Sequence, residues 1–475
     1  MNQALTIPHS VALRWGNGAL IGALVGSLGI VGLVAWNAPN LTIFLLVAFL
    51  ALGSGAFLFT RPRLNFIVWL GGLALLFSSE PGFQIHEVLY GLYFYAYLAH
   101  WYGQRLLLYK RPIIRGAVDI SVALWLVLGL GLGIALGLLF GADLIRIRGE
   151  AIAFTMLAIY FPIKEFCIRD RHGPAIILAI LVWIGIWVTV DNLLVARQTL
   201  TEATMLWEIA DVRKAGRELL LTFSGVLLLA ILPTIRKRSY QGVVALVLVI
   251  LLGGLVLTKS RAYWVEYIVA VIVLFAVSPG RERKRMAGWC IAGAIILALL
   301  SVLFLSSYVN LLMAGTSARF ATLGTASTDL SLLGRFVEAE AVLKKAWRNP
   351  ILGYGFGTEY SFFNIVSYTT LTKSHIHVGF VAVLYKFGLW GSVLVAYTWI
   401  LSMLDAFRGS RREMATTFER SLLRGIFACS FSMILPALTT SVFFEDEKLA
   451  AFVIVIALGI GITSSRPRVL PHHLG

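Results

Sequence analysis

Charged residues are scarce in this sequence. Only 13% of its 475 residues are Asp, Glu, Lys or Arg, against roughly 25% in soluble globular proteins, and 59% are hydrophobic. Apolar runs near the ~20 residues that a helix needs to cross a bilayer recur from end to end. They predict an all-α polytopic membrane protein, because a lipid-exposed open sheet would leave backbone polar groups without partners.

Cysteine is also rare, and it occurs only at Cys167, Cys290 and Cys429. These three residues are odd in number and widely spaced, which excludes a regular disulfide framework and the spacing of a zinc site. The first 17 residues are too polar to contain the apolar core of a cleavable signal peptide. We therefore expect the first membrane helix to be retained.

The apolar runs predict about 14 transmembrane helices. The expected spans are 18–36, 41–59, 65–79, 87–103, 117–140, 150–166, 174–195, 218–235, 241–258, 262–279, 288–308, 377–407, 421–442 and 448–464. The twelfth span contains a break at Lys386 to Gly391. The chain then divides into spans 1–11 (residues 1–308), a large, partly helical loop region (309–376) and spans 12–14 (377–475), which together form one membrane domain.

Lys and Arg cluster in alternate loops. Segments such as "TRPRLN", "IRKRSYQ", "RERKRMAG" and "RGSRRE" are basic, whereas "NAPN", "SSEPGFQ" and "FFEDEK" are poor in Lys and Arg. By the positive-inside rule, both termini are expected in the cytoplasm. Two long outer segments, near 196–217 and 309–376, then face the other side. The same distribution explains the net charge of +16 without a nucleic-acid partner.

The second outer segment is expected to fold. Residues 334–348, "GRFVEAEAVLKKAWR", carry an apolar stripe at helical spacing, formed by Phe336, Ala339, Leu343 and Trp347. Asn349-Pro350 then ends the helix. Glycines at 353, 355 and 357 predict a tight, backbone-exposed turn. A nucleotide-binding glycine loop is disfavoured, because no strand precedes this turn.

Basic residues on the expected outer face are exceptions to the charge pattern. Arg261 lies between two apolar runs in "VLTKSRAYW", where it either reaches lipid phosphates, pairs with Glu266 or binds another anionic group. Arg213 and Arg217 share a helical face by their spacing. Arg335 stands at the start of the loop helix, where the helix dipole disfavours a cation. Solvated charge is the alternative for Arg213 and Arg217, and either an external anion or a carboxylate partner would explain Arg335. Bidentate guanidinium contacts would suit a lipid-linked diphosphate.

Two histidines, His375 and His377, mark a water–lipid boundary in "TKSHIHVGF". Residues two apart share a face only on an extended segment, and no nearby carboxylate or cysteine set completes a metal site. We therefore expect neither a metal nor another cofactor. A structural role at the helix start and acid–base catalysis are the open alternatives. A neutral imidazole can take a proton from a sugar hydroxyl while cations bind a departing diphosphate.

Three segments together resemble the O-antigen ligase and Wzy polymerase superfamily. They are "TKSRAYW" (258–264), "GRFVEAEAVLKKAWRNPILGYGFGTEY" (334–360) and "HIHVGFVAVLYKFGLWG" (375–391). The superfamily has an Arg after Ser at the outer end of a span, which matches Arg261. It then has a long outer loop with an Arg…Trp…Pro-x-x-Gly-x-Gly stretch, and a His eleven residues before a Gly-x-x-Gly, which is His377 when counted back from Gly388.

Other positions match the superfamily less closely. Its further outer arginine fits Arg213 best, with Arg217 as the rival. It usually has Asn where Val378 stands, and often an acidic residue just before the Gly388 position, near which this chain has Lys386. The clear resemblance covers residues 205–395.

The resemblance implies a metal-independent, inverting GT-C-type glycosyltransferase at the periplasmic face of the bacterial inner membrane. Its donor would be a glycan on undecaprenyl diphosphate, surrounded by membrane lipids. His377 would be the catalytic base, and Arg261 with Arg213 or Arg217 would bind the diphosphate. His375 and Arg335 would be auxiliary substrate contacts.

Two acceptors are compatible with the resemblance. A polymerase extends another lipid-linked glycan, whereas an O-antigen ligase transfers the glycan to lipid A–core. Polymerases of this superfamily often have more spans than ligases, so the expected span number favours a Wzy-like polysaccharide polymerase. A flippase for lipid-linked oligosaccharides is a more distant alternative, which would place charges in several helices around a central cavity.

Overall fold

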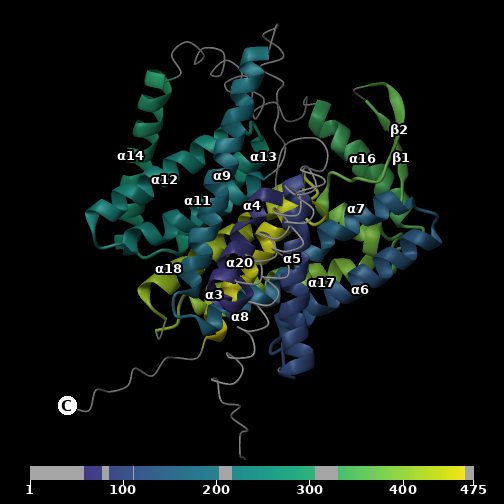
Figure 1. The fold of residues 1–475 in the computed structure, drawn as a ribbon. Coiled ribbons are helices and arrows are strands. Elements are labelled where there is room, and N and C mark those ends of the chain that lie inside the picture. Colours follow the sequence, from purple (N-terminus) through teal and green to yellow (C-terminus); the bar gives the residue numbers. More distant parts are fainter. Residues whose placement is uncertain are drawn as a thin grey trace, which may run out of the picture. The chain divides into compact units, whose positions relative to one another are not determined.

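The protein is described by a computed structural model that covers residues 58–76, 85–110, 112–202, 217–304, 330–365, 367–413 and 415–465 (Figure 1). The chain forms two compact units, Met1–Leu70 and Gly71–Gly475. In the first unit, the described residues contain most of helix α3 (Pro62–Gly71). The other elements and all described candidate site residues belong to the second unit.

Helices dominate the second unit. In chain order they are α4 (Leu73–Leu76), α5 (Ile85–Gly103), the π-helical turn η1 (Gln104–Leu108), α6 (Ala117–Leu139), α7 (Leu144–Phe154), η2 (Thr155–Ile159), α8 (Tyr160–Arg169), α9 (Gly173–Glu202), α11 (Glu218–Ile231), η3 (Leu232–Thr234), α12 (Arg238–Leu257), α13 (Arg261–Val277), α14 (Gly280–Phe304), α16 (Leu330–Ala346), α17 (Gly379–Gly409), α18 (Thr417–Ser432), α19 (Ile434–Ala437) and α20 (Asp446–Ser464). The expected helical membrane architecture is confirmed at this level.

One short β-hairpin was not predicted. Strands β1 (Tyr360–Asn364) and β2 (Thr369–Lys373) pair antiparallel, with Tyr360 opposite Lys373 and Asn364 opposite Thr369. These are the only strands among the described residues, and they lie in the expected loop region between α16 and α17.

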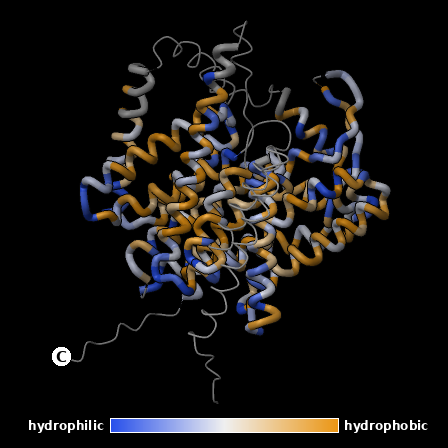
Figure 2. Tube along the Cα trace, viewed as in Figure 1, coloured by the Kyte–Doolittle hydropathy of each residue, from blue (hydrophilic) through white to orange (hydrophobic). Residues whose placement is uncertain are grey.

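Six described helical segments are long and apolar enough to cross a membrane. They are Ala117–Leu139, Leu144–Arg169, Gly173–Val195, Arg238–Leu257, Gly379–Gly409 and Asp446–Ser464. Each coincides with an expected span, and hydrophobic residues run along them (Figure 2). The expected spans 18–36 and 41–59 lie almost wholly outside the described residues. The total of about 14 spans therefore stays a prediction.

Several expected boundaries are wrong. The 65–79 span is divided into α3 and α4, both shorter than a bilayer requires. The 421–442 span ends early, because α19 stops at Ala437 and residues 438–445 form a non-helical connector before α20. In contrast, α9 continues to Glu202, and α14 begins at Gly280 within the basic segment. Lys and Arg are good helix formers, so a basic loop sequence does not by itself end a helix.

The break expected in the twelfth span is confirmed at Gly388, which has φ 64° and ψ −159° inside α17. In a regular helix, the amide of Leu389 would bond to the carbonyl of Tyr385. Here Leu389 N–H instead donates to Pro350 O (2.8 Å), and Tyr385 O accepts from Tyr354 N–H (2.9 Å). The turn after α16 thus replaces hydrogen bonds that lipid could not supply.

The same turn contains the three alternating glycines. Gly353, Gly355 and Gly357 have φ of +73°, +78° and +70°, a region that L side chains rarely adopt. A Cβ added to Gly353 would lie 2.6 Å from the amide nitrogen of Gly388. The tight turn is confirmed, but it is buried rather than exposed. Glycine is needed because this backbone packs directly against the helix break.

Helix α16 packs onto the start of α17 and onto the hairpin. The shared core contains Val342, Ala346, Tyr360, Ile376 and Tyr385 among others. The expected apolar stripe of α16 is partly wrong, since Phe336 and Trp347 are 59% and 68% exposed. The buried face is instead formed by Glu338, Ala339, Val342 and Ala346. Helix α16 is therefore rotated about its axis relative to the expected orientation, and this places the acidic side chain of Glu338 in the interior.

Candidate functional site

His377 lies just before α17, whose first cap residue is Val378. Its Nδ1 is 2.8 Å from Oε2 of Glu338, which projects from α16. The Glu338 side chain is 2% exposed, whereas the His377 side chain is 38% exposed. One side of the His377 ring therefore contacts a buried carboxylate, while the ring as a whole still reaches solvent. It does not cap α17, because that helix has no side-chain hydrogen bond at its N-cap.

Tyr360 holds the other side of the Glu338 carboxylate. Its hydroxyl lies within hydrogen-bonding distance of Oε1 of Glu338 and of the carbonyl oxygen of His375 (2.6 Å), and its single proton is donated to one of these acceptors or shared between them. Burial alone would raise the pKa of Glu338, but the hydrogen bonds with His377 and Tyr360 and the charge of His377 lower that pKa overall. Glu338 is therefore a carboxylate at neutral pH, and a buried carboxylate accepts hydrogen bonds only.

This carboxylate decides which ring nitrogen of His377 carries the proton. Because Glu338 can only accept, the neutral ring places its proton on Nδ1 and leaves a lone pair on Nε2. Nε2 makes no hydrogen bond to any side chain or backbone group in the described part of the chain. The arrangement is that of a general base whose orientation and tautomer are set by an acid behind it.

His375 accompanies this pair without joining it. Its ring meets the His377 ring edge to face, with centroids 5.3 Å apart. Loss of hydration on its protein side and the neighbouring His377 lower the pKa of His375 to about 4, although the side chain still contacts solvent. His375 is thus a neutral hydrogen-bonding group at neutral pH. In the described ranges, no group of three His, Cys, Asp or Glu side chains is placed to hold a metal ion.

The connector at 438–445 brings three predicted site segments together. Arg335 donates from Nη1 to the carbonyl oxygen of Thr439 (2.8 Å). The hydroxyls of Tyr263 and Thr440 lie 3.1 Å apart, which ties the first turn of α13 to the connector. The start of α17 packs there too, since a Cβ on Gly379 would lie 2.9 Å from the carbonyl oxygen of Thr440.

Arg261 is therefore placed at the same connector as the segments that carry Arg335 and His377. It is the first residue of α13 and is half-buried. The ion pair considered between Arg261 and Glu266 does not form, because both carboxylate oxygens of Glu266 lack a hydrogen-bond partner among the described residues. The placement expected for Arg335 is also wrong, since α16 begins at Leu330 and Arg335 lies in its second turn.

Arg217 is bound more deeply than a solvated arginine. Its Nη1 lies 2.6 Å from Oδ2 of Asp191, its amide donates to Oε1 of Glu447 (3.2 Å), and its side chain is 7% exposed. Its φ of 74° is left-handed, so Arg217 is not part of the helical face expected with Arg213. Arg213 itself lies outside the described residues, and the diphosphate role of both stays a prediction.

Lys386, which stands near the position where the superfamily often has an acid, forms a second ion pair on α17. Its Nζ lies 2.9 Å from Oε1 of Glu150 and 3.3 Å from the carbonyl oxygen of Thr358. Glu150 also accepts from the amide of Gly357 (2.9 Å). This pair therefore fastens the glycine turn to α7 and α17, rather than facing solvent.

With this geometry in place, the comparison with protein families is decisive. Residues 246–396 match the family model Wzy_C, described as O-antigen ligase. This segment is therefore similar to O-antigen ligases. It includes Arg261, Arg335, Glu338, His375 and His377, and the family resemblance inferred from the motifs is confirmed. A comparison with curated proteins found no match.

Glu338 and Tyr360 belong to the candidate site, although the motifs did not predict them. In "GRFVEAEAV", Glu338 and Glu340 look alike, yet Glu340 pairs with exposed Lys344 while Glu338 is buried. The available signal was helical spacing: Glu338, Val342 and Ala346 recur every four residues on one face.

Proposed function

We propose that this protein is an inverting, metal-independent glycosyltransferase that moves a glycan from undecaprenyl diphosphate to a sugar hydroxyl. The reaction would take place at the periplasmic face of the bacterial inner membrane. The observation that carries the proposal is the hydrogen bond of the buried Glu338 carboxylate with Nδ1 of His377, inside the segment that is similar to O-antigen ligases. It leaves Nε2 of His377 as a base at a solvent-reaching position.

The proposed reaction is a single displacement. The acceptor hydroxyl oxygen attacks the anomeric carbon, its proton passes to Nε2 of His377, and the bond from that carbon to the diphosphate oxygen breaks. The diphosphate leaves with the electron pair, and attack from the opposite side inverts the configuration. Glu338 stabilises the imidazolium that forms. A positioned general base of this kind contributes about 10²- to 10⁴-fold.

Arginines would stabilise the departing charge. Arg261 begins α13, so its guanidinium and the positive end of that helix dipole lie at the same place. Arg213 or Arg217 would supply a further contact to the diphosphate, and Arg335 and His375 would contact the sugars. A planar guanidinium group can donate two parallel hydrogen bonds to phosphate oxygens. This geometry suits both the diphosphate of the bound donor and the diphosphate that leaves.

The acceptor distinguishes two candidate functions. The expected number of spans favours a Wzy-like polymerase, whose acceptor is a second lipid-linked glycan. The description of the matched family favours the second candidate, an O-antigen ligase that transfers to lipid A–core. Both reactions would use the same base and the same leaving group.

The test is an assay with purified protein and undecaprenyl-diphosphate glycan, whose products are resolved by size. A ladder from donor alone identifies a polymerase, and a single transfer that needs added lipid A–core identifies a ligase. The reaction should proceed with EDTA present. Transfer to neither acceptor contradicts the glycosyltransferase, and a requirement for added divalent metal contradicts the metal-independent mechanism.

Arg261 offers a separate test of donor binding. Arg261→Ala should lower kcat/KM for the lipid donor by about 10- to 100-fold, the value of a charge-assisted hydrogen bond. Arg261→Lys should recover part of this loss, because it keeps the charge without the bidentate geometry. Exposed Arg348, at the end of α16, provides the control variant Arg348→Ala. Equal kcat/KM values for Arg261→Ala and the control would remove Arg261 from the donor site.

A further inference from the structure

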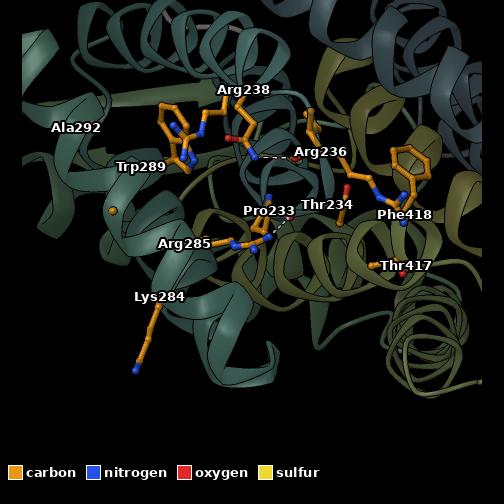
Figure 3. A pocket seen from close by; sticks show the side chains of 13 residues that line it. Pro233, Thr234, Arg236, Arg238, Lys284, Arg285, Trp289, Ala292, Thr417 and Phe418 are labelled. Atoms are coloured by element: carbon orange, nitrogen blue, oxygen red, sulfur yellow. Dashed lines mark hydrogen bonds between the residues drawn. The ribbon is translucent and has the colours of Figure 1, made fainter.

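A cavity of about 950 Å³ lies where three helices of the second unit begin. Its lining comes from η3 and its link to α12, from the first turn of α12, from the second to fourth turns of α14, and from the start of α18 (Figure 3). Helix α12 starts at this cavity and ends four residues before Arg261. Twenty helical residues span about 30 Å, so the cavity is separated from the proposed site by the length of a membrane helix.

The cavity is basic and contains no acidic lining residue. Arg236, Arg238, Lys284 and Arg285 line it. Within the described ranges, none of these four forms an ion pair with a carboxylate. The nearby carboxylate of Glu282 is already held by Arg424 and Ser421.

Clustering around one hollow goes beyond what membrane topology requires. The positive-inside rule needs basic residues in a loop, but it does not need cations from separate elements to surround one cavity. Like charges gathered around one hollow repel one another, and a bound anion would relieve that repulsion. Arg285 is held in place by its bond to the carbonyl oxygen of Pro233 (3.2 Å), and Gln241 fixes the link by donating to the carbonyl oxygen of Ile235 (2.6 Å).

Aromatic and apolar side chains adjoin these cations. Trp289 and Phe418 line the cavity itself. Beyond it, α12 and α14 expose apolar side chains along their length, namely Val243, Leu246, Ile250, Ile291 and Ile295. A ligand that combines an anionic head with long apolar chains fits both surfaces, because its chains can continue along the helices. A free phosphate would use only the basic part.

We propose that this cavity binds the phosphate headgroup of an anionic phospholipid in the leaflet that the charge pattern assigns to the cytoplasm. Basic pockets between membrane helices on that side are suited to anionic headgroups. Arg236 and Arg238 are the principal contacts, whereas Lys284 extends away from them (Figure 3). This inference does not depend on the proposed glycosyl transfer, whose residues lie at the other end of α12.

The test measures binding of short-chain phosphatidylglycerol to the full chain in an uncharged detergent, by native mass spectrometry. Phosphatidylcholine with the same chains and inorganic phosphate serve as comparison ligands. The double variant Arg236→Gln, Arg238→Gln should bind phosphatidylglycerol about 30-fold more weakly, since each basic residue at an anionic lipid surface contributes about fivefold. Arg281→Gln is the matched control, because Arg281 is exposed on α14 without lining the cavity.

A charge-preserving double variant guards against a loss of folding. Arg236→Lys with Arg238→Lys should keep most of the affinity, and Arg281→Gln should bind within about twofold of the unchanged protein. Unaltered binding in the Gln double variant would overturn the site. Phosphatidylcholine binding as tightly as phosphatidylglycerol would overturn the headgroup selectivity. Inorganic phosphate binding as tightly as phosphatidylglycerol would show that the cavity takes a soluble anion and not a lipid.

Discussion

Two acid–base pairs at the start of α17 have similar lengths and opposite burial. Nδ1 of His377 lies 2.8 Å from Glu338, and Nζ of Lys386 lies 2.9 Å from Glu150. In the first pair the acid is buried and the base is 38% exposed. In the second the base is 2% exposed and the acid is 16% exposed. Only the first pair presents an unused nitrogen to solvent.

The difference separates the pair proposed to be reactive from a structural one. A buried acid behind an accessible base can orient that base while a substrate approaches it. The buried Lys386 ammonium donates to Glu150 and to the carbonyl oxygen of Thr358, so it fastens the glycine turn to the helix break rather than facing a substrate. The distance within such a pair therefore says little about the role of the pair. Which of the two side chains is exposed to solvent says more.

We expect the substitution His377→Ala to have the largest effect, which is a loss of catalysis. Loss of the base should lower transfer by about 10²- to 10⁴-fold, while expression and lipid-donor binding persist. The measurement is product formation from undecaprenyl-diphosphate glycan, together with donor binding. His172→Ala, at an exposed histidine in a different loop, is the control. Full activity of His377→Ala would exclude it as the base.

Lys386→Met should show the reverse pattern, with a loss of stability. Removing one partner of a buried ion pair costs about 3 kcal/mol or more. Denaturation of the detergent-solubilised protein would measure this free energy of unfolding. Lys344→Met breaks an exposed pair with Glu340 on α16, which water screens, so it should change the stability little. Similar costs for the two variants would contradict the structural role of Lys386.

Glu338→Gln should weaken catalysis without weakening donor binding. Removing the hydrogen-bond partner that orients a metal-binding histidine costs about 10- to 100-fold. We expect a loss of that order here, so kcat should fall while KM for the donor holds. Glu340→Gln, two residues away on the exposed face of the same helix, is the matched control. A higher KM at constant kcat would assign Glu338 to substrate binding rather than to positioning His377.

The smallest expected effect is a pH dependence from His375. Its folded-state pKa of about 4 lies below the ordinary 6.5, so the unfolded chain takes up a proton first as the pH falls. Its contribution to stability is therefore present above pH 6.5 and is lost between 6.5 and about 4. The loss should stay below about 1 kcal/mol because the side chain contacts solvent.

The check is the thermal midpoint of the purified protein and of His375→Gln across that pH range. The variant should lose part of the decline seen between pH 6.5 and 4, with little change at pH 7.5. Glu338, whose pKa is lowered from 4.5, keeps its own contribution above that pH and loses it as the pH falls further, so most of the decline from His375 comes first, between pH 6.5 and about 4.5. An identical decline in both proteins would remove His375 as its source.

Local patterns predicted a large part of the fold and one residue of the pair proposed to be reactive. The family pattern, counted back from Gly388, distinguished His377 from His375, and the alternating glycines predicted the turn at 353–357. Glu338 escaped prediction because its burial depends on the rotation of α16, and that rotation is set by the hairpin and α17 packing against it. The connector at 438–445 escaped too, since its apolar residues read as the end of a helix.

The sequence by itself determined that the chain is a helical membrane protein, where its long spans lie and which motifs it shares with O-antigen ligases. Hydrophobic runs and residue spacing are local properties of the chain, so they can be recognised in the sequence alone. Only the tertiary structure decided that Glu338 contacts His377, that Lys386 pairs with Glu150 and so fastens the glycine turn to α17, and that arginines of α12 and α14 line one cavity. Each of these contacts joins side chains from different helices. Spacing along the chain does not determine which residues of different helices come close together.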